Sequence, residues 1–395
     1  MKEIVTVQIG SFANFIGSHF WNYQDEMLGL ASHSNSDPVF KDLHKYVNMD
    51  VLYRAGENYQ GVFTYTPRVI SIDYQGALGS MTMGGGLYDD CSNEQLGVSS
   101  WSGDVSTEKA QPRKKNLFLQ RLHDDETKDS DSNSEIGAFQ DQDIIENLEK
   151  TVEFWTDYSK VHYHPHSFYE LCGLWMDPLE FDHYGIGSNV YSEGQRGEEM
   201  NDKLRFFVEE CDHIQGFQFF VGNSGGFSSI AADFLEQIAD DYPNTPILLY
   251  NVMDPASQMG TRTRNQSTSR KIQDAVSFSR LSSFSDMIVP VGLPLLSRSK
   301  ASSFLQMRDE SNYHCSAVYA AAFHSVSLPF RMEQLGSSTC VSGATDMNLL
   351  VQRLTAQARQ NGVVVLDLAF PPPTIPGTGK RNLSEETFVL KCSIS

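Results

Sequence analysis

A glycine- and serine-rich segment between an apolar run and an amphipathic run is the part of this sequence best suited to bind an anion. It reads Gly222-Asn-Ser-Gly-Gly-Phe-Ser-Ser229. Glycines let the backbone approach a ligand closely, and the serine hydroxyls can donate hydrogen bonds to phosphate oxygens. A tight strand-to-helix turn with a serine cap explains the same residues equally well, because the Lys of the G-x-x-x-x-G-K-[ST] motif is absent. Both interpretations stay open at this point.

The N-terminus contains a second turn of this kind. Residues 4–9 alternate as a buried strand, Gly10 follows, and the apolar spacing of residues 11–21 predicts a helix. Such a turn directs backbone N–H groups and the positive end of the helix toward a phosphate. A strand, a glycine turn and a helix are the opening expected of a nucleotide-binding α/β fold.

Two other clusters could hold a metal ion or transfer protons. His162, His164 and His166 would share one face of a strand and could bind zinc, but no acidic or Cys partner at a known spacing completes the site. Three carboxylates within residues 177–182 could supply a general acid and a general base. We interpret the histidines as part of an exposed loop and the carboxylates as a solvated loop. A metal- or carboxylate-dependent hydrolase has little else in its favour.

The elements that must position these residues alternate between strands and helices. Such alternation predicts an α/β fold with a mostly parallel, Rossmann-type sheet flanked by helices on both faces. The expected strands are 4–9, 69–72, 171–176, 216–221, 247–252 and 363–368. The expected helices are 11–21, 144–158, 201–211, 230–240, 273–284, 313–326 and 348–360.

A polar segment interrupts this pattern between residues 89 and 147. It is rich in Ser, Asp, Glu, Lys and Gln. Such a composition cannot bury enough apolar surface to offset the entropy lost on ordering. We therefore predict a large, disordered acidic insertion at 89–147.

The charge balance excludes broad nucleic-acid binding. Thirty Lys and Arg face 50 Asp and Glu, which gives a formal net charge of −20. A chain of that charge repels phosphate backbones and anionic lipid.

The six cysteines have no C-x-x-C spacing and are expected to be reduced thiols. No run of 18 apolar residues occurs, so we expect no transmembrane segment and only peripheral membrane association.

Several motifs resemble those of tubulin, in the same order along the chain. The opening Met1-Lys-Glu-Ile-Val-Thr-Val-Gln-Ile-Gly10, with Asn14, Ile16, Gly17, Phe20 and Trp21, resembles M-R-E-I-V-x-x-Q-x-G-x-x-x-N-x-I-G-x-x-F-W. Pro67-Arg-Val-Ile-Ser-Ile-Asp73 resembles P-R-A-x-x-x-D, and Cys211-Asp-His-Ile-Gln-Gly-Phe-Gln218 resembles C-D-x-x-Q-G-F-Q. The segment 222–229 stands where tubulin has G-G-G-T-G-S-G.

The acidic insertion is similar to the Misato family instead of tubulin itself, as are Trp155-Thr-Asp-Tyr158 and Val161-His-Tyr-His-Pro-His-Ser167. The chain is therefore identified as a Misato-type member of the tubulin/FtsZ superfamily. The resemblance implies that 1–88 and 148–345 form a tubulin-like nucleotide-binding domain. Residues 346–395 would begin a second, truncated domain with a Pro/Gly-rich tail, as in a truncated isoform.

The resemblance also implies a nucleotide site, with GTP as the candidate cofactor. We expect no metal ligands in this chain. The residues of this sequence that the resemblance places in the nucleotide site are Gly10, Ser11, Asn14, Asp73, Gly185, Gly187, Ser188, Gly222, Asn223, Ser224, Gly225, Gly226 and Ser228.

Departures from the tubulin pattern put guanine recognition in doubt. Phe227 is a bulky residue inside the glycine loop, and Gln75 stands where tubulin has a Glu near the nucleotide and its magnesium. The two asparagines that contact guanine in tubulin fall at Ser283 or Phe284 and at Ser316. The sequence 185–189 stands for the family's G-A-G-N-N loop.

Hydrolysis is in doubt for a separate reason. In tubulin filaments an acidic segment of one subunit completes the next subunit's site and positions the attacking water. The equivalent stretch here, 343–350, has Asn348 near the position of the expected Asp, while Asp346 lies at a shifted register. We therefore expect no catalytic residues and no enzyme activity.

Misato-like proteins are implicated in mitochondrial distribution and morphology, so the resemblance supplies a process. We expect a tubulin-like scaffold or assembly factor in the cytoplasm, peripherally associated with the mitochondrial outer membrane through protein partners. Co-assembly with microtubules is not expected. The alternative is an active GTPase switch or a filament-forming protein of the tubulin superfamily.

Overall fold

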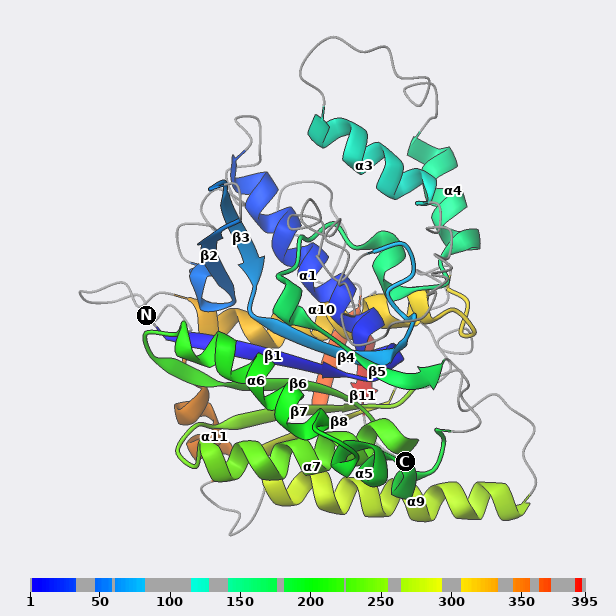
Figure 1. Ribbon diagram of the computed structural model, residues 1–395, viewed down its shortest axis with the longest axis vertical. Coiled ribbons are helices and arrows are strands. Elements are labelled where there is room, and N and C mark those ends of the chain that lie inside the picture. Colours follow the sequence, from blue (N-terminus) through cyan, green and yellow to red (C-terminus); the bar gives the residue numbers. More distant parts are fainter. Residues whose placement is uncertain are drawn as a thin grey trace, which may run out of the picture.

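A parallel sheet forms the centre of the protein (Figure 1). The computed structural model describes residues 2–32, 47–58, 61–81, 115–127, 141–175, 181–223, 225–254, 264–292, 307–332, 344–355, 362–370 and 388–392. Within these residues the sheet has seven strands in the order β5-β4-β1-β6-β7-β8-β9, and neighbouring strands in it are parallel. The expected α/β architecture with a parallel sheet is confirmed.

The strands of this sheet are largely buried, as a sheet covered by helices on both faces requires. Every residue of β1 and of β7 is buried. The bounds are β1 (Glu3–Ile9), β4 (Val69–Gln75), β5 (Phe168–Trp175), β6 (Ile214–Gly222), β7 (Ile247–Val252), β8 (Met287–Val291) and β9 (Gly362–Val363).

One face of the sheet is covered by α1 (Ser11–Ser32) and α10 (Asn312–Arg331), which lie side by side. Phe20 of α1 and Phe323 of α10 meet over Phe220 of β6, with ring centroids 5.6 and 5.0 Å from that ring. Edge-to-face and tilted contacts of this kind add to the gain from burial. The helix α11 (Met347–Thr355) packs on β6.

The opposite face carries α7 (Gly225–Asp241), which contacts both α5 (Tyr184–Ser192) and α9 (Arg264–Phe284) (Figure 1). The helix α6 (Arg196–Glu209) also lies on this side. Ile230 and Phe234 of α7 are fully buried in this layer.

Smaller elements surround the sheet. They are η1 (Met49–Val51), the hairpin of β2 (Tyr53–Glu57) and β3 (Phe63–Pro67), α3 (Leu117–Thr127), α4 (Asp141–Thr151), η4 (Trp155–Tyr158), η5 (Pro165–Ser167) and the antiparallel pair β10 (Leu366–Phe370) and β11 (Phe388–Cys392). Among the described residues, no helix combines the length and the apolar character needed to cross a membrane.

Some expected elements are corrected by the structure. Residues 185–189, expected as a loop, form part of helix α5, because the lack of a side chain at Gly187 lets α5 pack closely on α7. The helix expected at 144–158 ends at Thr151, and η4 follows it. The strand expected at 363–368 is divided between β9 and β10. The hairpin β2–β3 and the strand β8 were not predicted.

Most of the expected acidic insertion lies outside the described residues. Within 89–147, however, α3 and the first residues of α4 are helical, which the composition did not indicate. Asn116 accounts for the start of α3, because its Oδ1 accepts a hydrogen bond from Leu119 N–H (2.9 Å) and its Nδ2 donates to Asp157 O (2.6 Å). Phe118 packs against the hydrophobic core.

The contact of β6 with α11 depends on Gly216. A methyl group there would lie 2.9 Å from Pro246 O and 2.3 Å from Met347 Sδ. We expect Gly216→Ala to lower the free energy of unfolding by about 1–3 kcal/mol, because overpacking displaces neighbouring atoms. Urea denaturation measures this. Gly29→Ala in α1 is the control, since a methyl group there meets nothing within 4 Å, and it should be neutral or stabilising. Equal stability of the two variants would contradict the packing argument.

Candidate functional site

The strand order reverses between β1 and β6. Strands β4 and β5 lie on one side of β1, and β6 to β9 lie on the other. At such a switch point a parallel sheet binds ligands beyond the carboxyl ends of its strands. Gly10 follows β1 and Gly222 ends β6, and a methyl group at Gly222 would lie 4.0 Å from Ile9 O. The structure therefore brings the two glycine turns of the sequence together.

Four of the predicted site residues form one hydrogen-bonded group at this edge. Gly10 has φ +100°, a conformation that favours glycine. The Ser11 hydroxyl donates to Asp73 Oδ1 (2.6 Å), and Asn14 Nδ2 donates to Asp73 Oδ2 (2.9 Å). The buried carboxylate of Asp73, at 3% exposure, thus orients both neighbours.

The environment of Asp73 is unusual for a carboxylate. Burial raises the pKa of Asp73 to about 6, although hydrogen bonds from Ser11, Asn14 and Tyr74 N–H favour the ionised form. At neutral pH the group is mostly ionised. Its negative charge opposes a phosphate at this edge of the sheet unless a cation lies between them.

In the second glycine turn, hydrogen bonds with β7 and α9 hold Asn223 in place. Asn223 N–H donates to Val252 O (2.8 Å), and the Ser277 hydroxyl donates to Asn223 O (2.9 Å). Asn251 Nδ2 donates to Asn223 Oδ1 (2.9 Å). Ser224, also predicted to contact a nucleotide, lies outside the described residues.

The start of α7 is bonded to another segment of the same chain. Gly226 N–H donates to Phe181 O (2.9 Å). Gly225 has φ +78°, and a methyl group there would lie 3.0 Å from the same oxygen. Ser228 is fully buried, and its hydroxyl donates to Gly225 O (3.0 Å). The Gly226 and Ser228 donors that were predicted to face a phosphate are therefore used internally.

Three aromatic rings fill the space beside these turns. Phe227 lies 5.0 Å from Phe181 and 4.7 Å from Tyr74, centroid to centroid and edge to face. A methyl group at Gly10 would lie 3.2 Å from the Phe227 ring, and one at Gly226 would lie 2.5 Å from the Phe181 ring. Phe181 and Phe227 are 3% and 8% exposed, so the cluster is closed to solvent.

The remaining predicted residues, Gly185, Gly187 and Ser188, belong to α5. Gly187 packs on the backbone of α7, since a methyl group there would lie 2.0 Å from Gly226 O. Gly185 and Ser188 are exposed, and a methyl group at Gly185 meets no neighbour within 4 Å. The structure does not join Gly185 or Ser188 to the group around Asp73.

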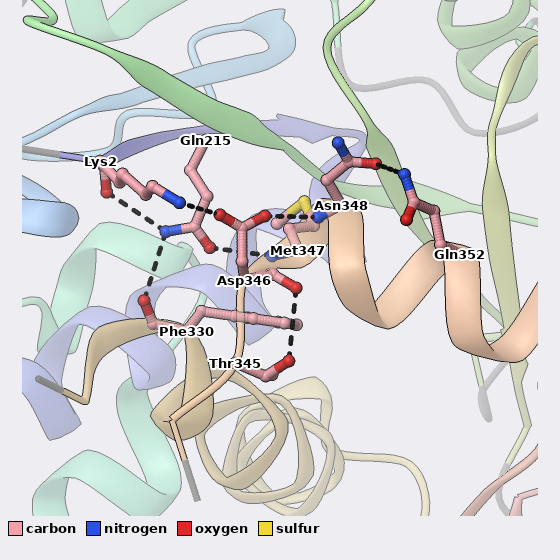
Figure 2. A network of polar contacts seen from close by, with 8 residues as sticks. All are labelled: Lys2, Gln215, Phe330, Thr345, Asp346, Met347, Asn348 and Gln352. Carbon is pink, nitrogen blue, oxygen red and sulfur yellow. Dashed lines mark hydrogen bonds and ion pairs between the residues drawn. The ribbon is translucent and has the colours of Figure 1, made fainter. Parts of the chain in front are cut away.

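Asp346 lies near the amino ends of the strands, in the network drawn in Figure 2. It forms an ion pair with Lys2, and Asn348 N–H donates to its Oδ1 (2.9 Å). Partial burial favours the protonated carboxyl, but Lys2 and the N–H groups of Asn348 and Leu349 outweigh it and lower the pKa of Asp346. The carboxylate therefore caps the start of α11 in its own chain.

Gln215 connects three separate parts of the chain in the same network (Figure 2). Its Nε2 donates to Lys2 O and to Phe330 O, both at 3.3 Å, and its Oε1 accepts from Met347 N–H (3.1 Å). The amide nitrogen and the amide oxygen of Gln215 thus both hold backbone groups.

At the positions expected to contact guanine, the serine hydroxyls form hydrogen bonds within their own helices. The Ser283 hydroxyl donates to Ser279 O (2.8 Å), and the Ser316 hydroxyl donates to Tyr313 O (3.2 Å). The Phe284 ring lies under the Arg280 guanidinium, 5.2 Å from its central carbon. None of these geometries is specific for a base.

The histidine cluster packs on an aromatic ring. His164 and His166 stack on Phe206, with centroids 4.7 and 4.3 Å away. Burial lowers the pKa of both imidazoles, to about 3 for His164. The described residues contain no group of three or more His, Cys, Asp or Glu side chains that could hold a metal ion. Of the carboxylate cluster, Asp177 and Glu180 lie outside the described residues.

Sequence reasoning missed the contacts of Phe181, Lys2 and Gln215. The pairing of Phe181 with Gly226 has no local signal, because 45 residues separate the two positions (226 − 181). The pairing of Lys2 with Asp346 joins positions 344 residues apart in the chain. Gln215, in contrast, stands in the tubulin-like motif 211–218, and a polar residue at the start of a buried strand was the available signal.

Comparisons with known proteins agree with the motifs. The Misato Segment II tubulin-like domain family matches residues 2–124, and the Tubulin domain family matches residues 146–332. Protein misato homolog 1 of Mus musculus is 32% identical over 383 residues, which cover 95% of this chain and 65% of the relative. The Homo sapiens protein of the same name is 31% identical over 400 residues, with 95% and 66% covered. Protein DML1 of Gibberella zeae is 28% identical over 363 residues, with 91% and 66% covered. The chain thus spans slightly less than two thirds of the length of these relatives.

The raised pKa of Asp73 makes stability depend on pH. The carboxyl has its ordinary pKa of 3.8 in the unfolded chain and about 6 in the folded protein. Between these values the folded protein binds a proton that the unfolded chain has lost, so this group's contribution to stability falls by roughly 3 kcal/mol as the pH rises from about 4 to about 6. Asp73→Asn lacks this titration. Urea unfolding across this range should therefore show the variant gaining on the wild type as the pH rises.

The matched control is Asp202→Asn on the surface of α6, where the side chain is 69% exposed. It should follow the wild-type profile. If the stability of Asp73→Asn relative to the wild type stayed constant or fell as the pH rises, the assignment would be contradicted.

Proposed function

Because the chain belongs to the Misato family of tubulin-like proteins, we propose that it is a scaffold or assembly factor for mitochondrial distribution and morphology that acts without GTP turnover. The process comes from the family resemblance. The absence of turnover is argued from the geometry of the two edges of the sheet.

The placement of Asp346 is the observation that carries this proposal. In a tubulin-like filament, an acidic residue of one subunit positions the attacking water in the site of the next. Asp346 is the acidic residue of the segment 343–350. One of its oxygens is paired with Lys2 and the other accepts from Asn348 N–H. A carboxylate held in this way is not free to orient water for a neighbouring subunit.

The carboxyl edge of the sheet supports the same conclusion. Phe181 and Phe227 pack beside the glycine turns, and the Gly226 and Ser228 donors are bonded internally. A triphosphate would have to displace these contacts before it could be positioned for attack.

Electrostatics favour a protein partner on the organelle. Anionic lipid attracts basic segments, and a chain with a formal charge of −20 is repelled by it. Recruitment from the cytoplasm to the mitochondrial outer membrane would therefore use a protein at that surface.

One observation favours the alternative, a GTPase switch or filament subunit. Gly10, Asn14 and Asp73, which match the tubulin-like motifs of the sequence, lie together with Ser11 around the buried Asp73 carboxylate. This group could accept a cation and a nucleotide if the second turn opened.

A measurement of GTP hydrolysis distinguishes the scaffold from the GTPase alternative. We expect the purified protein, given Mg²⁺ and GTP, to release phosphate at the blank rate at every protein concentration tested. Lys2→Ala, which removes the ion pair of Asp346 but leaves the hydrogen bond from Asn348 N–H, should also stay at the blank rate because the glycine turn remains closed. A rate above blank that Gly225→Val abolishes would establish the GTPase alternative instead.

Experiments in cells test the proposed role in mitochondrial distribution and morphology. Depletion of the protein should alter the distribution or shape of mitochondria before the mass of polymerised tubulin changes. In fractionation, the mitochondrial pool should be released by carbonate or salt, since a protein partner holds it. Retention in the membrane pellet after carbonate, or stoichiometric pelleting with stabilised microtubules, would contradict the proposal.

A further inference from the structure

The segment of residues 181–184, which leads into α5, contacts both α7 and α9. We propose that this segment is a built-in plug of the glycine turn, in which the Phe181 carbonyl oxygen takes the place of a phosphate oxygen at the start of α7. The proposal rests on the proposed function and adds to it the reason why the turn is stable without a nucleotide.

The first contact is the one an anion would make. The early N–H groups of a helix have no partner within the helix, and a phosphate commonly binds them. Here Gly226 N–H, the second residue of α7, donates to Phe181 O at 2.9 Å. The same oxygen lies 3.0 Å from where a side chain at Gly225 would begin. A neutral carbonyl thus satisfies the donor that a charged ligand would need.

The Phe181 ring completes the closure. It packs directly on Gly226, where a methyl group would lie 2.5 Å from the ring, and it contacts Phe227 and Tyr74 edge to face. The ring is 3% exposed. A ligand that displaced the carbonyl would also have to expel this ring into water, which costs free energy in proportion to the apolar area exposed.

A second anchor holds the far end of the plug. Tyr184 N–H donates to Gln273 Oε1 of α9 at 3.0 Å, and Gln273 Nε2 lies 3.4 Å from His183 Nδ1. Gln273 is only partly buried, so a substitution there does not disturb the core. The plug is therefore hydrogen-bonded to α7 through Phe181 and to α9 through Tyr184. The bond to α9 can be removed by substitution of Gln273, which leaves the atoms that form the bond to α7 unchanged.

The glycines of this region have a structural explanation under this proposal. Gly225 and Gly226 admit the Phe181 carbonyl and ring, and Gly187 admits the backbone of α7 to α5. Each contact is made by the chain itself. In a nucleotide site, glycines let the backbone lie close to a phosphate. Here Gly225 and Gly226 let the backbone lie close to Phe181 of the same chain.

Hydrogen exchange of the whole chain, followed by mass spectrometry, tests the plug without relying on activity. In the wild-type protein, peptides that contain Gly226 and residues 181–184 should exchange slowly, and Mg²⁺ with GTP should not change their rates. Gln273→Ala removes the acceptor for Tyr184 N–H and should accelerate exchange in both peptides about threefold to tenfold. Gln273→Glu keeps an acceptor oxygen at the same place and should stay close to the wild type.

The outcomes separate this inference from the proposed function. Slower exchange at Gly226 when GTP is added to the wild type, with phosphate release still at the blank rate, overturns the plug and leaves the non-hydrolysing scaffold standing. Wild-type exchange rates in Gln273→Ala overturn the plug as well. Phosphate release above the blank rate overturns the proposed function, whatever the exchange of these peptides shows.

Discussion

The close approach of α5 to α7 at Gly187 and Gly226 is the constraint on which the candidate site depends. No side chain fits between the two backbones at this point. With the helices at this distance, the residues just before α5 fall against the start of α7, and Phe181 reaches Gly226 N–H. The fold of the sheet brings the two glycine turns together, but this helix contact determines what lies beside them.

The two edges of the sheet share one physical pattern, in which groups expected to bind a ligand or a neighbouring subunit form hydrogen bonds within the chain. At the carboxyl edge, donors of the turn bind Phe181 O and Gly225 O. At the amino edge, Asp346 binds Lys2, and Gln215 holds three backbone groups. A buried polar group without a partner is costly, so each such bond stabilises the isolated chain. The same bonds withdraw these groups from ligands and from neighbouring subunits.

The sequence predicted the elements whose signal is local. The strand, glycine and helix at 4–21 were found because apolar periodicity and Gly10 lie in one short window, and most of the central strands were found for the same reason. The helix α5 was missed because Gly185 and Gly187 disfavour a helix and only contact with α7 offsets that preference. The ring cluster at the turn was missed because Phe181, Tyr74 and Phe227 meet only in three dimensions.

The strand order also governs how the chain can fold as it is synthesised. Strand β1 precedes both of its partners in the chain, since β4 begins at Val69 and β6 begins at Ile214. Until β6 leaves the ribosome, one edge of the central strand has no mate, and its apolar residues lack the α7 layer. Such long-range pairing slows folding and prolongs the lifetime of aggregation-prone intermediates. A nascent chain of this topology therefore leaves one edge of its central strand unpaired until β6 has been synthesised.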